Sequence, residues 1–270
     1  MSENFNQEHI RERNGIKRRL EDYSVISKNR EINVYFKNLE NHLIEHIKEA
    51  DIVVGCVAWL TNKEILTALN TRIGVALVIN KKDIYGDLRD SYDELPPIRT
   101  DVLQTETLID CLQNEYIEPI RCVGIRPKTT NKCSKRTNKI IPLMHNKFLV
   151  FCKASKKDMG YGREQTIEYF LENDSWKDRV IDYETSENFN DYNNWLYNSD
   201  FLLSINYIKP YAVWTGSFNF SVNATKSFEN ALYITEPSIV QAYFSEWSQL
   251  ECLSESLDSE SVSLSPEWEL

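Results

Sequence analysis

Apolar positions in the first third of the chain follow two alternating periodicities. Between residues 33 and 50 they recur at helical spacing, which predicts an amphipathic helix, and apolar runs at 52–60 and 74–79 predict two buried strands. Residues 61–64 have the capping-box pattern of a helix start, and this helix is expected to continue through residue 70. The order helix, strand, helix, strand is typical of an α/β sandwich.

The same alternation is expected to continue toward the C-terminus. Periodicity predicts helices at about 101–115 and 238–250. Apolar runs predict further strands at about 120–125, 144–151 and 231–235.

These elements divide the chain into three parts. Residues 1–30 are predicted to form a polar, helical N-terminal arm, residues 31–252 the folded domain, and residues 253–270 an acidic, Ser-rich tail. Within the domain, the segment at about 153–210 interrupts the pattern. From residue 158 to 200 it holds eleven acidic and three basic residues, with nine aromatic ones. We interpret it either as a surface insertion with its own aromatic core or as an acidic lid over a basic groove.

The length and composition of the chain limit its class. With 270 residues it can bury a sizeable core in one large domain. It contains no apolar run approaching the ~20 residues of a membrane helix, and its polar N-terminus has no hydrophobic signal segment. We therefore expect a soluble, cytoplasmic protein without a membrane partner. The six cysteines form no Cys-x-x-Cys pair, which favours reduced thiols over a disulfide framework.

Two short segments carry the polar side chains that indicate chemistry. His145 and Lys147 lie two positions apart in a run of Phe, Leu and Val, so on a strand they would project from one face and favour an anion. About seventy residues later, Gly216 is followed by Ser217 and Asn219, which would also share a face as a second strand ends. Together the segments offer a nucleophile or base, a cation and two neutral hydrogen-bonding groups.

This pair of segments resembles the signature of the phospholipase D superfamily, His-x-Lys-x4-Asp followed by Gly-Ser-x-Asn. The resemblance extends over about residues 33–250. It implies an α/β fold, a phospholipase D-like α/β/α sandwich with a mixed central sheet. It also implies that Glu229, at the family's distance after Asn219, accepts a hydrogen bond from the catalytic His145.

The chain departs from this signature at one position, because the family's Asp falls on Cys152. On a strand, residue 152 has the parity of 148 and 150 and not that of Lys147. We therefore expect Cys152 to point away from the site and to behave as a small apolar residue.

The net charge of −10 conceals a strong asymmetry along the chain. Residues 121–157, the basic block, hold eleven Lys and Arg and no acidic residue, whereas 227–270 hold nine acidic residues and no basic one. Because the basic block brackets His145, we expect it to bind a polyphosphate, with a solvated basic loop as the alternative. The substrate-binding residues predicted from it are Arg126, Lys128, Lys132, Lys135, Arg136 and Lys139.

A competing motif lies in the first predicted helix. Residues His42 to His46 have the His-x-x-Glu-His pattern of inverzincin metalloproteases, and two His four positions apart could bind zinc beside Glu45. Such a pattern arises easily by chance on a charged amphipathic helix, and it borders the apolar stripe. A zinc site on Cys122 and Cys133 lacks obvious further ligands. We therefore expect no metal and no cofactor.

The resemblance implies a metal-independent phosphodiesterase, and the basic flanks favour a nuclease that cleaves DNA or RNA through a phosphohistidine. In that mechanism His145 attacks phosphorus and Glu229 orients it. Lys147 and Asn219 hold the non-bridging oxygens, and Ser217 assists.

The resemblance also bears on assembly and setting. A single copy of each motif implies a homodimer with the active site at the two-fold interface, in which the second His145 protonates the leaving oxygen. Defence against foreign nucleic acid is a setting that the resemblance implies. A phospholipid-hydrolysing phospholipase D and a catalytically inactive nucleic-acid-binding scaffold are the alternatives.

Overall fold

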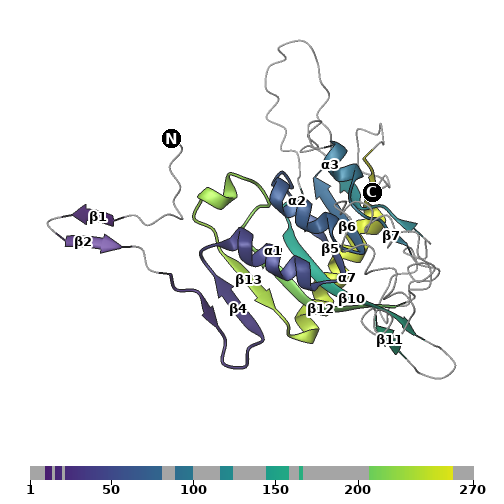
Figure 1. Cartoon of the computed structure of the whole chain (residues 1–270), viewed down its shortest axis with the longest axis horizontal. Helices are drawn as coiled ribbons and strands as arrows, with labels where there is room; N and C mark the ends of the chain where they lie inside the picture. The colour runs from purple at the N-terminus through teal and green to yellow at the C-terminus, as the bar shows by residue number, and fades with distance from the viewer. Residues whose placement is uncertain are drawn as a thin grey trace, which may run out of the picture.

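A single large mixed sheet organises the protein (Figure 1). The computed structural model describes residues 10–13, 16–19, 22–80, 89–99, 116–123, 144–157, 164–166 and 207–257. The strands of the sheet follow the order β14 (Glu255–Ser256), β9 (Ile120–Val123), β6 (Gly74–Asn80), β5 (Ile52–Val57), β10 (Lys147–Lys157), β12 (Tyr207–Gly216), β13 (Ala231–Ile234), β4 (Ile32–Tyr35) and β3 (Val25–Ile26), and β11 (Glu164–Thr166) pairs with β10. Strands β5, β6 and β9 run parallel to one another, and the remaining pairs are antiparallel.

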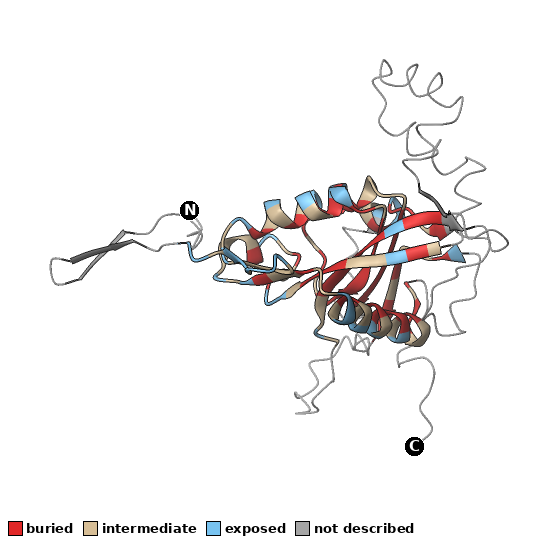
Figure 2. Cartoon of the chain, turned by 90° about the horizontal axis from the view of Figure 1, so that it is seen from below, coloured by how far each residue is buried: buried red, intermediate tan, exposed pale blue. Residues whose placement is uncertain are grey.

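Helices cover both faces of this sheet (Figure 2). On one face, α1 (Leu39–Glu49) and α2 (Lys63–Asn70) pack against alternate residues of β5 and β10. On the other face lies α7 (Pro237–Leu253), which contributes Val240, Phe244 and Trp247. The predicted α/β/α sandwich with a mixed central sheet is therefore confirmed.

Smaller elements complete the described chain. Helix α3 (Arg89–Asp93) precedes a short antiparallel pair of β7 (Ile98–Arg99) and β8 (Tyr116–Ile117). A 3-10 helix (Ala224–Lys226) lies between β12 and β13.

The long apolar runs form the strands that the sequence predicts, with shorter bounds. β5 is buried along its whole length, and so is β6. The first helix starts later than expected, because residues 32–35 pair with β13 as β4. The cap of α2 is Asn62 and not the first residue of the capping-box pattern, since the Asn62 side chain accepts hydrogen bonds from the backbone N–H groups of Glu64 and Ile65.

The N-terminal arm is not helical where the structure describes it. Residues 10–13 and 16–19 form the antiparallel strands β1 and β2 (Ile10–Arg13 and Ile16–Arg19). The expectation of a helix is therefore wrong for this segment. Each strand has one apolar residue followed by three charged ones, Ile-Arg-Glu-Arg and Ile-Lys-Arg-Arg, so neither sequence has an apolar period that separates a helix from a strand.

The sheet includes both ends of the segment that interrupts the sequence pattern. β10 continues to Lys157 and β12 begins at Tyr207. Likewise, the predicted tail begins inside the fold, because Glu255 and Leu257 are buried and β14 pairs with β9. The predicted helix at 101–115, the basic residues from 126 to 139 and most of the acidic segment lie outside the described residues.

The cysteines differ in state. Cys56, Cys122 and Cys152 are free and buried, and burial raises the pKa of the Cys56 and Cys152 thiols well above the ordinary value. Cys252 is disulfide-bonded, so the expectation of reduced thiols throughout is wrong at this position. Within the described parts of the chain, no helix combines the length and apolarity needed to span a membrane.

Candidate active site

Four chain segments meet at one edge of the sheet. Because β5 and β10 are antiparallel, Lys147 at the start of β10 lies opposite Val57 at the end of β5. On the other side of β10, Phe148 lies opposite Thr215, so Gly216 ends β12 beside the start of β10. Gly216 in turn pairs with the first residue of β13. The pairing thus brings together the two motif segments, which are far apart in the sequence.

His145 and Lys147 are in direct contact at this edge. The Lys147 Nζ lies 3.1 Å from Nδ1 of His145 and donates to the His145 carbonyl oxygen at 3.0 Å. His145 is exposed and lies two residues before the start of β10, whereas the sequence predicts both residues on one strand face. The two side chains are therefore close together, as strand parity predicts, although His145 itself lies outside the strand. An ammonium group can only donate, so in a hydrogen bond between these two side chains the imidazole nitrogen is the acceptor.

Trp59 completes this cluster and was not predicted from the sequence. Its indole ring stands edge-on to the His145 ring, with centroids 4.9 Å apart and planes at 88°. The Lys147 Nζ lies 5.4 Å from the indole centroid, within the range of a cation–π interaction. Trp59 belongs to no motif; the signal that could have found it is an aromatic residue just past the end of a buried strand.

Ser217 and Glu229 close the loop that follows β12. The Ser217 Oγ donates a 2.5 Å hydrogen bond to Oε2 of Glu229 and accepts one from the Asn230 backbone N–H at 3.0 Å. The Ser217 N–H donates to the Asn230 carbonyl oxygen. The hydroxyl is thus used within the loop. The described contacts of Glu229 run to Ser217, whereas the resemblance implies a partner in His145.

Asn219 has an unused acceptor. Its Oδ1 is buried, and no hydrogen-bond partner for it occurs among the described residues. The Asn219 carbonyl oxygen accepts from the Ser221 N–H and fixes the backbone of the turn. A buried acceptor without a partner is costly, and only a hydrogen-bond donor, such as a water molecule, can satisfy it.

Gly216 is required by close packing at the end of β12. A Cβ at this position would lie 2.4 Å from the Asn230 carbonyl oxygen and 2.8 Å from the Ala231 Cα. Both contacts are with backbone, which cannot move aside as a flexible side chain can. Glycine therefore allows the two ends of the connection between β12 and β13, which carry Ser217 and Glu229, to approach each other.

Charge and burial act against each other on Lys147. Desolvation lowers its pKa, and the negative charge of Glu229 opposes this shift. The carboxylate is therefore close enough to favour the ammonium form. The end of the sheet where the motif segments meet thus carries one cation, one carboxylate, an imidazole and a carboxamide.

Cys152 lies on the opposite face from the site chemistry. It shares the α7 side of the sheet with Phe148 and Val150 and is fully buried. The orientation expected from strand parity is confirmed, because the bulge between Phe151 and Cys152 affects pairing with β12 and leaves pairing with β5 regular.

Two described members of the basic block have structural roles. Arg121 donates to the Ser254 side chain and lies 3.3 Å from Glu251, so it ties β9 to the end of α7. Lys153 donates to the Glu49 carbonyl oxygen and pairs with Asp51. The six predicted substrate-binding residues from 126 to 139 lie outside the described residues.

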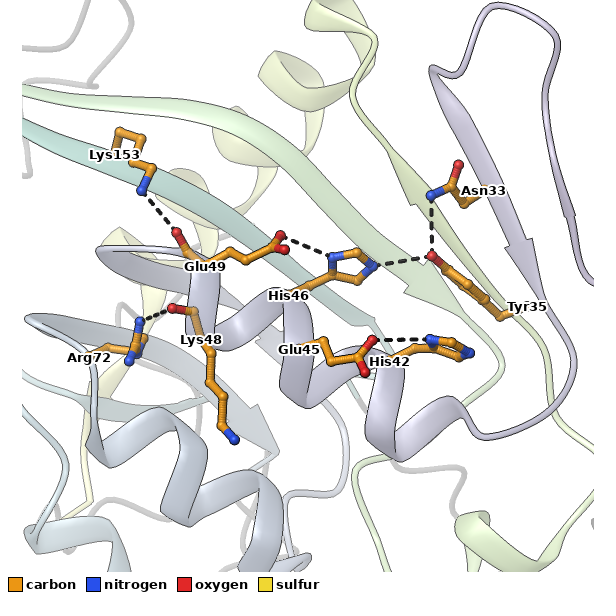
Figure 3. Close-up of polar contacts among 9 residues, drawn as sticks. All are labelled: Asn33, Tyr35, His42, Glu45, His46, Lys48, Glu49, Arg72 and Lys153. Atoms are coloured by element: carbon orange, nitrogen blue, oxygen red, sulfur yellow. Dashed lines mark hydrogen bonds and ion pairs between the residues drawn. The ribbon is translucent and has the colours of Figure 1, made fainter.

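The His-x-x-Glu-His segment is part of the packing of α1 (Figure 3). His42 pairs with Glu45 at 3.4 Å and stacks on Tyr35. The Nε2 of His46 contacts the Tyr35 hydroxyl at 3.3 Å, and its ring stacks on Tyr233. Burial lowers the pKa of His46, against the opposing effect of Glu49. Each His thus has aromatic and polar partners within the fold.

In the part of the chain that the structure describes, no group of three or more His, Cys, Asp or Glu side chains could hold a metal ion.

Comparisons with known proteins give distant similarities. No family model matches the chain. Uncharacterized protein L381 of Acanthamoeba polyphaga mimivirus is 29% identical over 242 residues, which cover 83% of this chain. The chain spans 66% of the length of that relative.

Two solved structures are similar in outline. NucT from Helicobacter pylori has a TM-score of 0.43 at 11% identity, with 81% of this chain and 93% of that chain covered. Nuc from Salmonella typhimurium, a phospholipase D family member, has a TM-score of 0.40 at 15% identity, with 81% and 91% covered. At these scores, the interpretation of the site rests on the residues of this chain alone.

Proposed function

We propose that the protein is a metal-independent phosphodiesterase of the phospholipase D type. The observation that carries this proposal is the meeting of the two motif segments at one edge of the sheet, where Lys147 contacts His145 and Gly216 lies beside the start of β10. A neutral imidazole, an ammonium and a carboxamide in this arrangement fit an anionic substrate whose central atom is attacked by a nucleophile.

His145 is the proposed nucleophile. Its neutral imidazole attacks phosphorus, a P–N bond forms, the P–O bond to the leaving group breaks, and the leaving oxygen takes a proton. Water then attacks the phosphohistidine and restores the imidazole. The exposed position of His145 just before β10 allows a large substrate to reach it.

Charge stabilisation falls to Lys147 and Asn219. The Lys147 ammonium neutralises the non-bridging oxygens, as phosphoryl transfer depends chiefly on positioning and electrostatics. The Asn219 side chain supplies amide donors from the opposite loop. Glu229, held by Ser217, supports the positive charge of Lys147 and orients His145 as the complex forms.

The acid for the first step is proposed to come from a second copy of the chain. One motif supplies one histidine, so His145 of the partner subunit protonates the leaving oxygen and later activates water. Val222 and Phe228, which are 51% and 63% exposed, lie within the connection between Ser217 and Glu229. Apolar side chains exposed beside a site that needs a second copy support a two-fold dimer there.

The proposed substrate is a nucleic acid. The basic residues from 126 to 139 precede His145 directly in the chain and would contact phosphates on either side of the scissile bond. A phospholipid would use the same site residues, and the exposed Val222 and Phe228 are the observation that favours a lipid surface. Nucleic acid is preferred because the charge next to His145 in sequence is strongly positive.

A substrate panel in EDTA tests the proposal. Single-stranded DNA, duplex DNA, RNA and phosphatidylcholine vesicles are each incubated with the wild type, His145→Ala and His42→Ala. We expect hydrolysis of at least one nucleic acid by the wild type and by His42→Ala, which makes the same substitution in the helix of Figure 3. His145→Ala should be inactive but folded. Cleavage of vesicles alone would favour the lipid hydrolase, and no cleavage of any substrate would reject the proposal.

A further inference from the structure

The backbone around Trp59 is anchored on both sides of the site. On one side, the Ala58 N–H donates to the carbonyl oxygen of Asn146, which lies between His145 and Lys147. On the other side, Leu60 forms a parallel bridge with Phe220, whose carbonyl oxygen accepts from the N–H groups of residues 61 and 62. The Trp59 backbone is therefore tied both to the His145 segment and to the Asn219 loop.

The neighbours of Trp59 are core residues, and Trp59 is not. Ala58 and Leu60 are 1% and 2% exposed, and the Tyr92 hydroxyl donates to the Leu60 carbonyl oxygen at 2.6 Å. Trp59 is only partly buried and belongs to neither of the two hydrophobic core layers. A tryptophan that is fixed at its backbone and directed out of the core needs another explanation than core packing.

The ring itself contacts the two groups that the proposed mechanism needs. Its edge-on contact with His145 provides a packing surface on one side of the imidazole. Its proximity to the Lys147 Nζ holds the ammonium near the imidazole and replaces water on one side of it. No other described aromatic ring contacts His145 in the structure.

We propose that Trp59 is a positioning residue that orients His145 and Lys147 toward the scissile phosphate. This inference rests on the proposed phosphodiesterase function. The rigid segment between Ala58 and Leu60 fixes the indole, and the indole fixes the imidazole and the ammonium. A flat aromatic side chain is required, because both contacts depend on the ring and not on apolar volume alone.

Three substitutions separate ring geometry from bulk. Trp59→Ala removes the side chain, Trp59→Leu keeps an apolar side chain without a ring, and Trp59→Phe keeps a ring. The substrate is bis(p-nitrophenyl) phosphate, a diester without a nucleobase, in parallel with the nucleic acid that the wild type cleaves. We expect kcat to fall roughly ten- to hundredfold in the Ala and Leu variants on both substrates, with a smaller change in KM, since misplacement of reacting groups has effects of this size. Trp59→Phe should recover most of the loss.

A matched control is Tyr116→Ala. Tyr116 is a partly exposed aromatic residue that precedes β9, which runs parallel to β5, so it lies at the opposite end of the sheet from Trp59. This variant should retain wild-type kcat. Circular dichroism and urea denaturation identify any Trp59 variant that fails to fold, and the Leu and Phe variants then carry the comparison.

Other results would overturn the inference. If Trp59→Ala keeps kcat within twofold, or if Phe is as harmful as Leu, the ring does not position the catalytic groups. If only KM rises, and only on nucleic acid, Trp59 is instead a stacking surface for a base. A wild type inactive on every substrate would reject the proposed function. Trp59 is then tested by binding of inorganic phosphate, followed through the His145 ring resonances, which Trp59→Leu should weaken several-fold and Trp59→Phe should leave unchanged.

Discussion

The Ser217 hydroxyl donates a 2.5 Å hydrogen bond to the Glu229 carboxylate and accepts one from the Asn230 N–H. This pair joins the end of β12 to the start of β13 at the point where Gly216 allows their backbones to approach. It also keeps a negative charge near Lys147. Gly216 and Ser217 therefore hold the ends of β12 and β13 together. Through its hydrogen bond to Glu229, Ser217 also keeps the carboxylate near Lys147.

Replacement of Ser217 by Ala should weaken catalysis without unfolding the protein. The variant leaves Glu229 and the Asn230 N–H without their shared partner, and a hydrogen bond to a charged group contributes about 1.5–3 kcal/mol. We expect kcat to fall at least tenfold in steady-state assays. Ser217→Thr retains the hydroxyl and should keep more activity than Ser217→Ala. Equal activity of Ser217→Ala and wild type would mean that the Ser217 hydrogen bonds to Glu229 and Asn230 do not matter for turnover.

Removal of either charge-stabilising group should lower turnover strongly. Lys147→Ala and Asn219→Ala are each expected to reduce kcat by about two orders of magnitude or more, as is typical when a preorganised donor is lost. Lys209→Ala is the control, because Lys209 is exposed on β12 away from the site edge. Single-turnover rates distinguish this effect from slow product release. A loss of less than threefold in either site variant would remove that residue from the mechanism.

The stability of the fold should depend on the ionisation of Glu251. Burial raises the pKa of Glu251 to about 8, although Arg121 lies 3.3 Å away and acts in the opposite direction. Burial outweighs the ion pair, because the side chain is 4% exposed and Oε2 of Glu251 has no hydrogen-bond donor among the described residues to stabilise the charged form.

The sign of the effect follows from proton binding. An unfolded Glu titrates near its ordinary value of about 4.3, so above that pH the folded state holds a proton that the unfolded chain has released. Stability should therefore decline as pH rises toward about 8. Urea denaturation from pH 5 to 9 should give a smaller decline for Glu251→Gln than for the wild type. Glu246→Gln, an exposed change on the same helix, should follow the wild type. Parallel curves for all three proteins would refute the assignment.

The basic residues before His145 should provide affinity that is independent of sequence. Reversal of Lys132, Lys135 and Arg136 to Glu should weaken binding to all nucleic-acid sequences alike and reduce the slope of log K against log salt, because fewer counterions are released. Fluorescence anisotropy at several salt concentrations measures both quantities. An unchanged slope would leave the segment as a solvated loop.

The apolar pattern of the sequence was sufficient to predict the elements that are long and buried. Every residue of β5 and β6 is buried, so their apolar runs mark them clearly. The short strands β3, β4 and β14 have two to four residues and no periodicity of their own. They are strands because β13 and β9 offer edges for pairing, which is information from distant parts of the chain.

The sequence predicted which residues form the site better than it predicted the contacts between them. The motif spacing placed Lys147 beside His145, and strand parity placed Cys152 on the other face. The pairing of Ser217 with Glu229 depends on how the loop folds back, which the spacing does not specify. Trp59 was missed because its position depends on the Ala58 hydrogen bond to Asn146, a contact between segments far apart in the sequence.

The most direct test of the account is whether a phosphoryl group becomes attached to His145 during turnover. A cleaved substrate is mixed with excess enzyme, the reaction is quenched under alkaline conditions that preserve phosphohistidine, and peptides covering residues 144–157 are examined by mass spectrometry. The account predicts a phosphorus-containing adduct on His145 that decays at the rate of turnover and is absent from His145→Ala. Full activity of His145→Ala, or an adduct on another residue with His145 unmodified, would contradict it.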